Sequence, residues 1–378
     1  MKKMALLSLF FSLSFPLLFS LFFPVQSAQG AQQQITILSD IFHRELNGKF
    51  TNDSLAQSIS VKGGLYFTVA NASLQSIWVI DPQLIEEISD MADGYKVLPS
   101  SEGQYSQSAQ EFLQLLKLKI GKNQIFALSY GSPNIAARAK ISEIELAKLQ
   151  SVSSLRLARV LNLPVSAGLP TGFTPNTSLP SNKAKIDFAI LNKTLNKIAQ
   201  ITTDPEVAEV ALRSNALLNP KLSRKEVQYL SISLNGAIDR LEKKVKVLPG
   251  QYTLTSTNEK IPVTVVNEFN APAEVILILK ANNARIVIDT AKKVTLAEKS
   301  RKQILISAKA VANGKVRVEA RLETEKGARY GEVKYLEFSI SMIGPVITWV
   351  TAGAGILLVS ASGIQIYRRT RKKVVINK

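Results

Sequence analysis

The sequence predicts a multidomain protein of the α/β plus all-β class, with a helical connector, an immunoglobulin-like β-sandwich and a single C-terminal transmembrane helix. Three observations predict it. Short apolar strands alternate with amphipathic helices up to about residue 200, β-rich segments fill residues 251–341, and an uncharged run covers residues 345–366. The expected parts are a signal peptide (1–30), an α/β domain (32–162), a Pro/Gly-rich linker (163–182), a helical segment (184–248), the sandwich (250–341), the transmembrane helix (345–367) and a basic cytoplasmic tail (368–378).

The first thirty residues have the order of a secretory signal. Lys2 and Lys3 precede a largely apolar run over residues 4–25, and small and polar residues follow. Cleavage after Ser27 or after Gly30 would leave short side chains at the positions that a signal peptidase recognises. Because the apolar run is long for a signal, an uncleaved anchor stays open as the alternative.

The α/β domain is predicted from strands that run directly into helices. SIWVID (76–81) is an apolar strand, and Pro82 then opens a helix at its first turn. AQEFLQLLKLKIG forms a second helix, NQIFALSY the next strand, and residues 135–160 are largely helical. The apolar face of the first helix consists of Leu84, Ile85, Ile88 and Met91.

Beyond a linker with four prolines and two glycines, the pattern is helical and then β-rich. Helices are expected over residues 186–200, from the Asp204-Pro205 cap to residue 218, and over residues 224–245. Seven strands in about ninety residues then predict the sandwich. They are QYTLTS, KIPVTVVNEF, AEVILILK, RIVI, KQILISAKA, GKVRVEARLE and VKYLEFSIS. In the sixth, Val316, Val318, Ala320 and Leu322 alternate with polar residues and are expected to face inward.

The C-terminal run is long enough to cross a hydrocarbon core of roughly 30 Å at 1.5 Å per residue. Aromatic and basic residues are expected to anchor it. A buried globular helix is the alternative, but such a helix seldom meets five cations within six residues. Since positive flanks stay cytoplasmic, we expect a single-pass plasma-membrane protein whose N-terminal part lies outside. The anchor residues are Trp349, Tyr367, Arg368, Arg369, Arg371, Lys372 and Lys373.

The charge of the chain favours an anionic surface over nucleic acid as a partner. The part between residues 30 and 344 holds 39 of the 47 cations and all 29 acids, a net charge of +10 instead of +18. This excess is scattered and lacks the arginine and aromatic interleaving of a nucleic-acid surface, so anionic lipid or wall polymer fits better. The chain has no cysteine, which excludes disulfides and thiolate metal sites.

Several segments together resemble an uncharacterised actinobacterial envelope family, the domain of unknown function 6049. They are GLYFTVANASLQSIWVIDPQLIEEISDMADGYKV, AQEFLQLLKL, IFALSYGSPNIAA and PGQYTLTSTNEKIPVTVVNEFNAPAEVIL, before a membrane helix and a basic tail. The resemblance implies an exported, C-terminally anchored protein with a (β/α)-barrel-like domain and a membrane-proximal sandwich. The family is commonly encoded beside a lipid II flippase, which implies a role in cell-envelope assembly.

The sequence departs from the family pattern in two places. The linker leads almost directly into the helices before the sandwich, so the barrel-like domain is expected to be partial. The family's loop typically reads Leu-Pro-Tyr-Gly-Asp-Pro-Asp, whereas residues 128–134 here read LSYGSPN. Both acidic positions of the loop are therefore neutral, and we expect a strand-to-helix turn in which Ser132 or Asn134 caps the helix near Ile135.

Few residues are placed for catalysis. Asp81 ends a strand, where barrel enzymes keep carboxylates, but Asp before Pro favours a helix cap. Glycoside hydrolysis needs a second carboxyl group, and the loop offers Ser132 and Asn134 instead. His43 is the only histidine, and a lone histidine is more often a surface or packing residue than part of a metal or serine-hydrolase site. No Gly-x-Ser-x-Gly elbow or phosphate-binding loop appears.

We therefore expect a non-catalytic, membrane-anchored extracytoplasmic protein that supports peptidoglycan assembly. Its expected partners are the lipid bilayer and either wall glycan or a membrane protein such as a lipid II flippase, and no cofactor, metal or nucleic acid is expected. The alternative is a glycosidase- or deacetylase-type hydrolase, and a third hypothesis is a stalk that lifts the outer domain from the membrane. The candidate ligand-binding residues are Asp81, Tyr130, Ser132 and Asn134.

Overall fold

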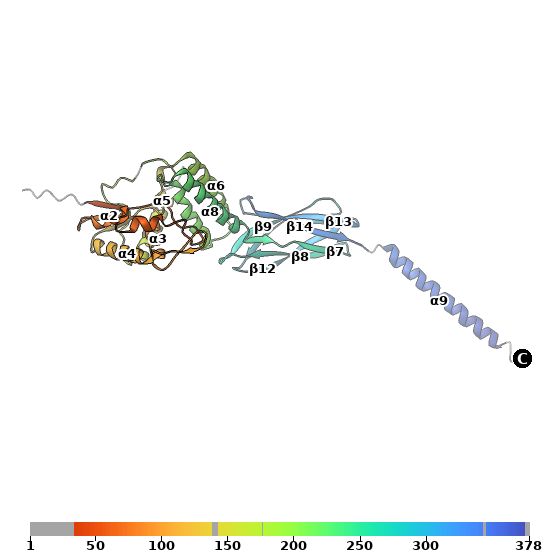
Figure 1. Cartoon of the computed structure of the whole chain (residues 1–378). Helices are drawn as coiled ribbons and strands as arrows, with labels where there is room; N and C mark the ends of the chain where they lie inside the picture. Colours follow the sequence, from red (N-terminus) through yellow and green to blue (C-terminus); the bar gives the residue numbers. More distant parts are fainter. Residues whose placement is uncertain (1–33, 138–142, 176, 343–344, 375–378) are drawn as a thin grey trace, which may run out of the picture.

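The computed structural model describes residues 34–137, 143–175, 177–342 and 345–374, and the predicted signal peptide lies outside them. Figure 1 shows an α/β region at one end, followed by the helices α6 and α8, a β-sandwich, and the helix α9 beyond it. The described chain is thus a mixed α/β protein with an added all-β domain and one apolar C-terminal helix.

The α/β region is built on three parallel strands in the spatial order β1 (Ile35–Leu38), β2 (Ile77–Ile80) and β5 (Ile125–Ala127). The strands stand in the order of the sequence, with helical crossovers between them. Trp78 and Ile80 of β2 are fully buried, as expected for a central parallel strand. The surrounding elements are α1 (Ser54–Ile59), α2 (Gly64–Ala70), α3 (Pro82–Ala92), β3 (Lys96–Val97), β4 (Ser101–Glu102), α4 (Ser106–Ile120), η1 (Ile135–Ala137) and α5 (Glu143–Leu161).

The predicted linker is not a free connection. Its Ser166 forms a parallel bridge with Phe126 of β5, and the amide of Ser166 donates to the carbonyl of Ile125 at 2.8 Å. The linker thus begins as a further extended segment beside β5. The sequence did not predict this pairing. It involves too few residues to produce a strand pattern, and prolines and glycines surround them.

The helical connector contains α6 (Asn182–Ile198), α7 (Pro205–Ser214), η2 (Asn215–Leu218) and α8 (Arg224–Glu242). The predicted cap of α7 is confirmed, because Asp204 accepts from the amide of Glu206 at 2.8 Å with Pro205 at the first helical position. Ser223 and Glu226 add a capping box to α8.

Two sheets form the sandwich, with strand orders β10-β12-β8-β6 and β11-β9-β13-β14-β7. All seven predicted segments form strands, and the inward positions of β13 predicted above are buried. Two further strands were missed, β6 and β11, and β6 places the start of the sandwich before residue 250. The strands are β6 (Val245–Val247), β7 (Gly250–Leu254), β8 (Asn258–Asn267), β9 (Ala273–Ala281), β10 (Ile286–Ile288), β11 (Ala291–Leu296), β12 (Arg301–Ala310), β13 (Gly314–Glu323) and β14 (Arg329–Ile340).

The helical connector and the sandwich share one hydrophobic core. Apolar residues of α6, α7 and α8 and of both sheets belong to a single contiguous cluster, whereas the α/β region has its own. Tyr330 of β14 lies at this junction, fully buried, and its hydroxyl donates to the carbonyl of Leu241 in α8 at 2.6 Å. The connector therefore packs as a cap on the sandwich.

The C-terminal helix α9 (Pro345–Val374) is the helix of the described chain that is long and apolar enough to cross a membrane, over Trp349–Arg369. The rest of the described chain does not cover it, and Leu357 and Leu358 are about 70% exposed. The described chain thus leaves this apolar segment unburied, unlike the core helix of a globular domain.

We expect Tyr330→Phe to lower the free energy of unfolding by about 0.5–1.5 kcal/mol, the usual contribution of one hydrogen bond. Tyr335→Phe is the matched control, because Tyr335 is 49% exposed on the neighbouring part of the same strand. Chemical denaturation of the two variants beside the wild type measures the difference. Equal midpoints for both variants would show that the bond to Leu241 does not hold the helices to the sandwich.

Candidate functional site

Asp81 lies at the carboxyl end of β2, and its side chain is almost completely buried. The predicted cap is confirmed, because the carboxylate accepts from the amide of Gln83 at 2.9 Å and Pro82 holds the first position of α3. The same carboxylate accepts from the amide of Gly131 at 3.1 Å and from the hydroxyl of Ser132 at 2.6 Å. Asp81 therefore fixes both the start of α3 and the loop after β5.

The loop after β5 has a backbone conformation that few residue types adopt. Gly131 has φ +78° and Ser132 has φ +46°, both in the left-handed region. Of the two caps proposed for the following helix, Asn134 is the one observed, because its side-chain oxygen accepts from the amide of Ala137 at 3.3 Å. Ser132 binds Asp81 instead, and this bond holds its unusual backbone in place.

Tyr130 points away from the loop surface and into a charged cluster between α3, α5 and α7. Its hydroxyl donates to Glu86 at 2.8 Å, and Arg156 donates to the same carboxylate at 3.1 Å. Arg156 also contacts Glu209, which pairs with Arg213 at 2.6 Å. Tyr130 thus joins the α/β region to the helical connector, where it packs with Leu149 and Leu212.

Burial determines the protonation of Asp81. Removal from water raises its pKa from 3.8 to about 7, although the hydrogen bonds from Ser132, Gln83 and Gly131 oppose the shift. Glu87, one turn along α3, is also buried, and burial raises its pKa while His43 and Arg44 oppose the change. The two carboxyl groups lie inside the protein, where neither contacts solvent.

His43 is a packing residue. It is 3% exposed, lies 3.5 Å from Asp40, and its backbone amide donates to Glu87 at 3.1 Å. Burial lowers the pKa of His43, but the contacts with Asp40 and Glu87 outweigh it and raise the pKa overall. No group of three or more potential metal ligands occurs among the described residues.

A cavity of about 920 Å³ opens beside the loop, at the carboxyl ends of β1 and β5. Ser132 and Asn134 line it, whereas Asp81 and Tyr130 lie behind its wall, so only two of the four candidate ligand-binding residues reach it. None of the described lining residues is acidic, and Lys221 is the one cation among them. Most of the lining is apolar, including Ile37, Leu128, Ile135, Leu146, Leu169 and Phe173.

The sequence-based prediction missed the far walls of this cavity. One wall comes from the predicted linker, whose Leu169 and Phe173 are large apolar residues among prolines and glycines. Another comes from Asn219, which is 3% exposed and donates to the carbonyls of Gly131 at 3.1 Å and Asp40 at 3.3 Å. Large apolar residues in a linker were the available signal for the first wall, while nothing local distinguishes Asn219.

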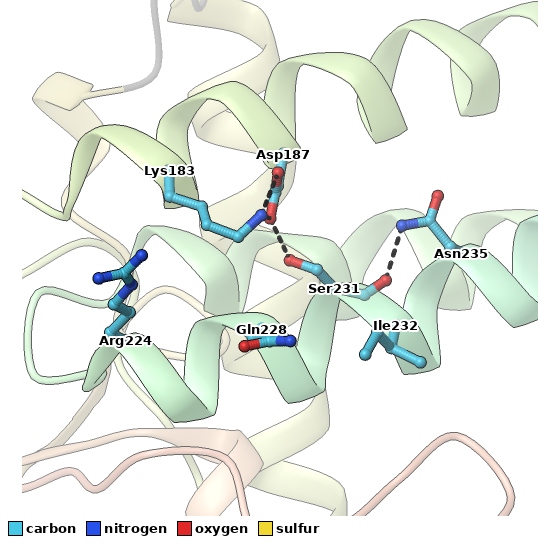
Figure 2. Close-up of a pocket in the computed structure, with 7 residues that line it drawn as sticks. All are labelled: Lys183, Asp187, Arg224, Gln228, Ser231, Ile232 and Asn235. Carbon is cyan, nitrogen blue, oxygen red and sulfur yellow. Dashed lines mark hydrogen bonds and ion pairs between the residues drawn. The ribbon is translucent and has the colours of Figure 1, made fainter.

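Figure 2 shows a second, smaller recess of about 390 Å³ between α6 and α8. Its polar groups are largely used within the protein, because Asp187 accepts from Lys183 at 2.8 Å and from Ser231 at 2.6 Å. Arg224 extends beside this group from the start of α8. The recess is a shallow, polar helix surface, so the larger cavity at the strand ends is the better candidate site.

The model of a family of unknown function, DUF6049, matches residues 175–373. The match begins after the α/β region, so the resembling segments before residue 175 lie outside it. No curated protein matches the chain.

Solved structures match about a quarter of the chain, at low sequence identity. WR4, an MSP family member of Caenorhabditis elegans, is 11% identical with a TM-score of 0.21, and covers 26% of this chain and 98% of its own. A CARDB domain from Pyrococcus furiosus is 15% identical with a TM-score of 0.21, over 26% and 90% of the two chains. A PapD-like domain of human CEP192 is 10% identical with a TM-score of 0.20, over 27% and 87%. TM-scores this low support no statement about function.

We expect Gly131→Ala to be far more destabilising than Gly48→Ala. Both glycines have positive φ, which costs another residue about 1–2 kcal/mol. A Cβ at Gly48 meets nothing within 4 Å, whereas one at Gly131 lies 2.8 Å from Ala216 and from the side-chain oxygen of Gln83. At Gly131, overpacking should lower the free energy of unfolding by a further 1–3 kcal/mol, roughly. Equal losses in denaturation midpoint would mean that the loop is not closely packed on the connector.

We expect the stability advantage of the wild type over Asp81→Asn to shrink as the pH rises from about 4 to about 7. With its pKa raised from 3.8 to about 7, the folded protein keeps a proton that the unfolded chain releases in this window. Denaturation of the wild type and of Asp81→Asn at a series of pH values measures the difference between their free energies of unfolding. Ser132→Ala is the companion variant, because loss of the donated hydrogen bond should raise the pKa of Asp81 further. An advantage that grows with pH would contradict the raised pKa.

Proposed function

The chain belongs to the DUF6049 family, and we propose from this premise that it is a non-catalytic, membrane-anchored protein that supports cell-envelope assembly by binding. The proposed ligand is wall glycan or a membrane partner, such as a lipid II flippase. The family match itself assigns no activity, so the proposal depends on the chemistry of the candidate site.

The observation that carries the proposal is the separation of the carboxylates from the cavity. Asp81 follows the end of β2, and its oxygens are used by Gln83, Gly131 and Ser132. Asp40 follows the end of β1, accepts from the amide of Ile41 and lies beside His43, and it does not belong to the described lining of the cavity either. Hydrolysis of a glycoside needs two carboxyl groups that face each other across the scissile bond. The described lining of the cavity offers none, and its apolar surface instead suits a bound ligand.

The proposed location is the outer face of the plasma membrane. The apolar part of α9 ends at Arg369, next to the basic tail, which supports a cytoplasmic C-terminus and an exported remainder. The parallel strands β1, β2 and β5 stand in sequence order, with Ser166 beside β5, which supports a partial (β/α)-barrel as the binding domain. A pure stalk is less favoured, because the sandwich and the helical connector share one core.

Crosslinking of the full-length protein in native membranes, followed by identification of partners, tests the proposal. We expect enrichment of wall glycan or of a membrane protein of wall assembly. Purified full-length protein should release neither sugar nor acetate from wall fragments. Release by the wild type that is lost in a folded Asp81→Asn variant would overturn the non-catalytic assignment.

A further inference from the structure

We propose that the cavity at the ends of β1 and β5 binds a single-chain amphiphile, with its hydrocarbon chain inside the cavity and its anionic headgroup at Lys221. This inference rests on the proposed binding function and names the chemical class of the ligand. It follows from the volume of the cavity, from the engagement of the amide side chains in its lining and from the position of Lys221, the cation among its described lining residues.

The volume and the lining suit a hydrocarbon chain. The cavity of about 920 Å³ falls within the range of pockets that enclose most of a small ligand. Its apolar walls include residues from separate parts of the chain, since β1 contributes Ile37, α5 contributes Leu146 and the predicted linker contributes Phe173. When an apolar ligand removes exposed apolar surface of this kind from water, the free energy of the system falls, which favours binding.

The amide side chains in the lining are already engaged. Asn134 donates to the carbonyl of Ser178 at 2.6 Å, Gln150 to that of Ala127 at 2.6 Å, and Asn219 to that of Gly131 at 3.1 Å. A glycan or a peptide would bring hydroxyl or backbone groups that need such donors. A hydrocarbon chain needs none, so it can enter without breaking the hydrogen bonds that hold the loop.

Lys221 provides a site for the headgroup. Its ammonium group lies at the protein surface and, among the described residues, donates to the carbonyl and the hydroxyl of Ser39, at 3.3 and 3.2 Å. The nearby carboxylate of Asp40 is used by the amide of Ile41 at 2.8 Å and by His43. Lys221 therefore keeps capacity for an anion such as a carboxylate or a phosphate, with no acidic residue in the described lining to repel it.

Binding of parinaric acid to the full-length chain in neutral phosphatidylcholine nanodiscs tests the inference, because this anionic chain fluoresces in apolar surroundings. We expect saturable fluorescence above that of empty nanodiscs. Ala147→Trp and Leu169→Trp fill the cavity from two different segments, α5 and the predicted linker, and each should weaken binding at least tenfold. Binding no stronger than to empty nanodiscs, or undiminished binding by both folded tryptophan variants, would overturn the proposal.

Lys221→Gln tests the headgroup. It should weaken binding of parinaric acid about two- to fivefold, as for an exposed ion pair, and leave binding of the neutral methyl ester unchanged. Lys225→Gln, which removes the same charge from the exposed start of α8, is the matched control and should change neither. Equal effects of the two variants would place the headgroup elsewhere and refute the assignment of Lys221.

Two sources of amphiphile share this chemistry, and mass spectrometry of the chain purified from native membranes distinguishes them. An acyl chain would indicate a membrane lipid, and a polyisoprenyl chain a lipid-linked carrier. Displacement of parinaric acid by wall glycan fragments, but not by hexadecyl phosphate, would refute the amphiphile. If partner capture in membranes succeeds while amphiphile binding fails, the proposed function stands and this inference falls.

Discussion

The buried carboxylate of Asp81 is the constraint on which the candidate site depends. One side chain accepts from the first turn of α3 and from two successive residues of the loop after β5. The loop in turn carries Gly131, whose missing side chain lets Ala216 of the connector approach. A strand end, a helix start, a loop and a neighbouring layer are thus held by a single group. The three hydrogen bonds that it accepts offset only part of its desolvation.

The carboxylate of Asp81 has a structural role here, at a position where an enzyme would have a catalytic carboxylate. A catalytic carboxylate at the end of a parallel strand must reach the reacting atoms. Asp81 instead lies beneath Ser132, while Asn134 and apolar side chains form the surface that a ligand would meet. Ser132 is neutral, and an acid in its place would lie beside the buried carboxyl group of Asp81 and raise its pKa further.

Local patterns predicted most elements, and long-range contacts account for what was missed. The caps at Asp81 and Asp204 follow from the residue next to each, and the buried alternation of β13 follows from period two. The short β6 follows α8 without a break, so its three residues were assigned to the helical segment. The role of Asn219 could not be predicted, because its partners at Asp40 and Gly131 lie far away in the chain. Tyr130 was assigned to a ligand for the same reason, since Glu86 is distant in sequence.

The parallel pair of β7 and β14 has a mechanical consequence. β14 is the strand that leads towards α9, and β7 follows the short β6 by which the chain enters the sandwich from the connector, with Leu336 opposite Gly250 and Ile340 opposite Leu254. Tension between a membrane anchor and a partner held at the far domain would pull these neighbouring strands in opposite directions along their length. The hydrogen bonds of the ladder would then bear the load together in shear instead of opening one after another, so this strand pair is suited to resist tension applied along its length.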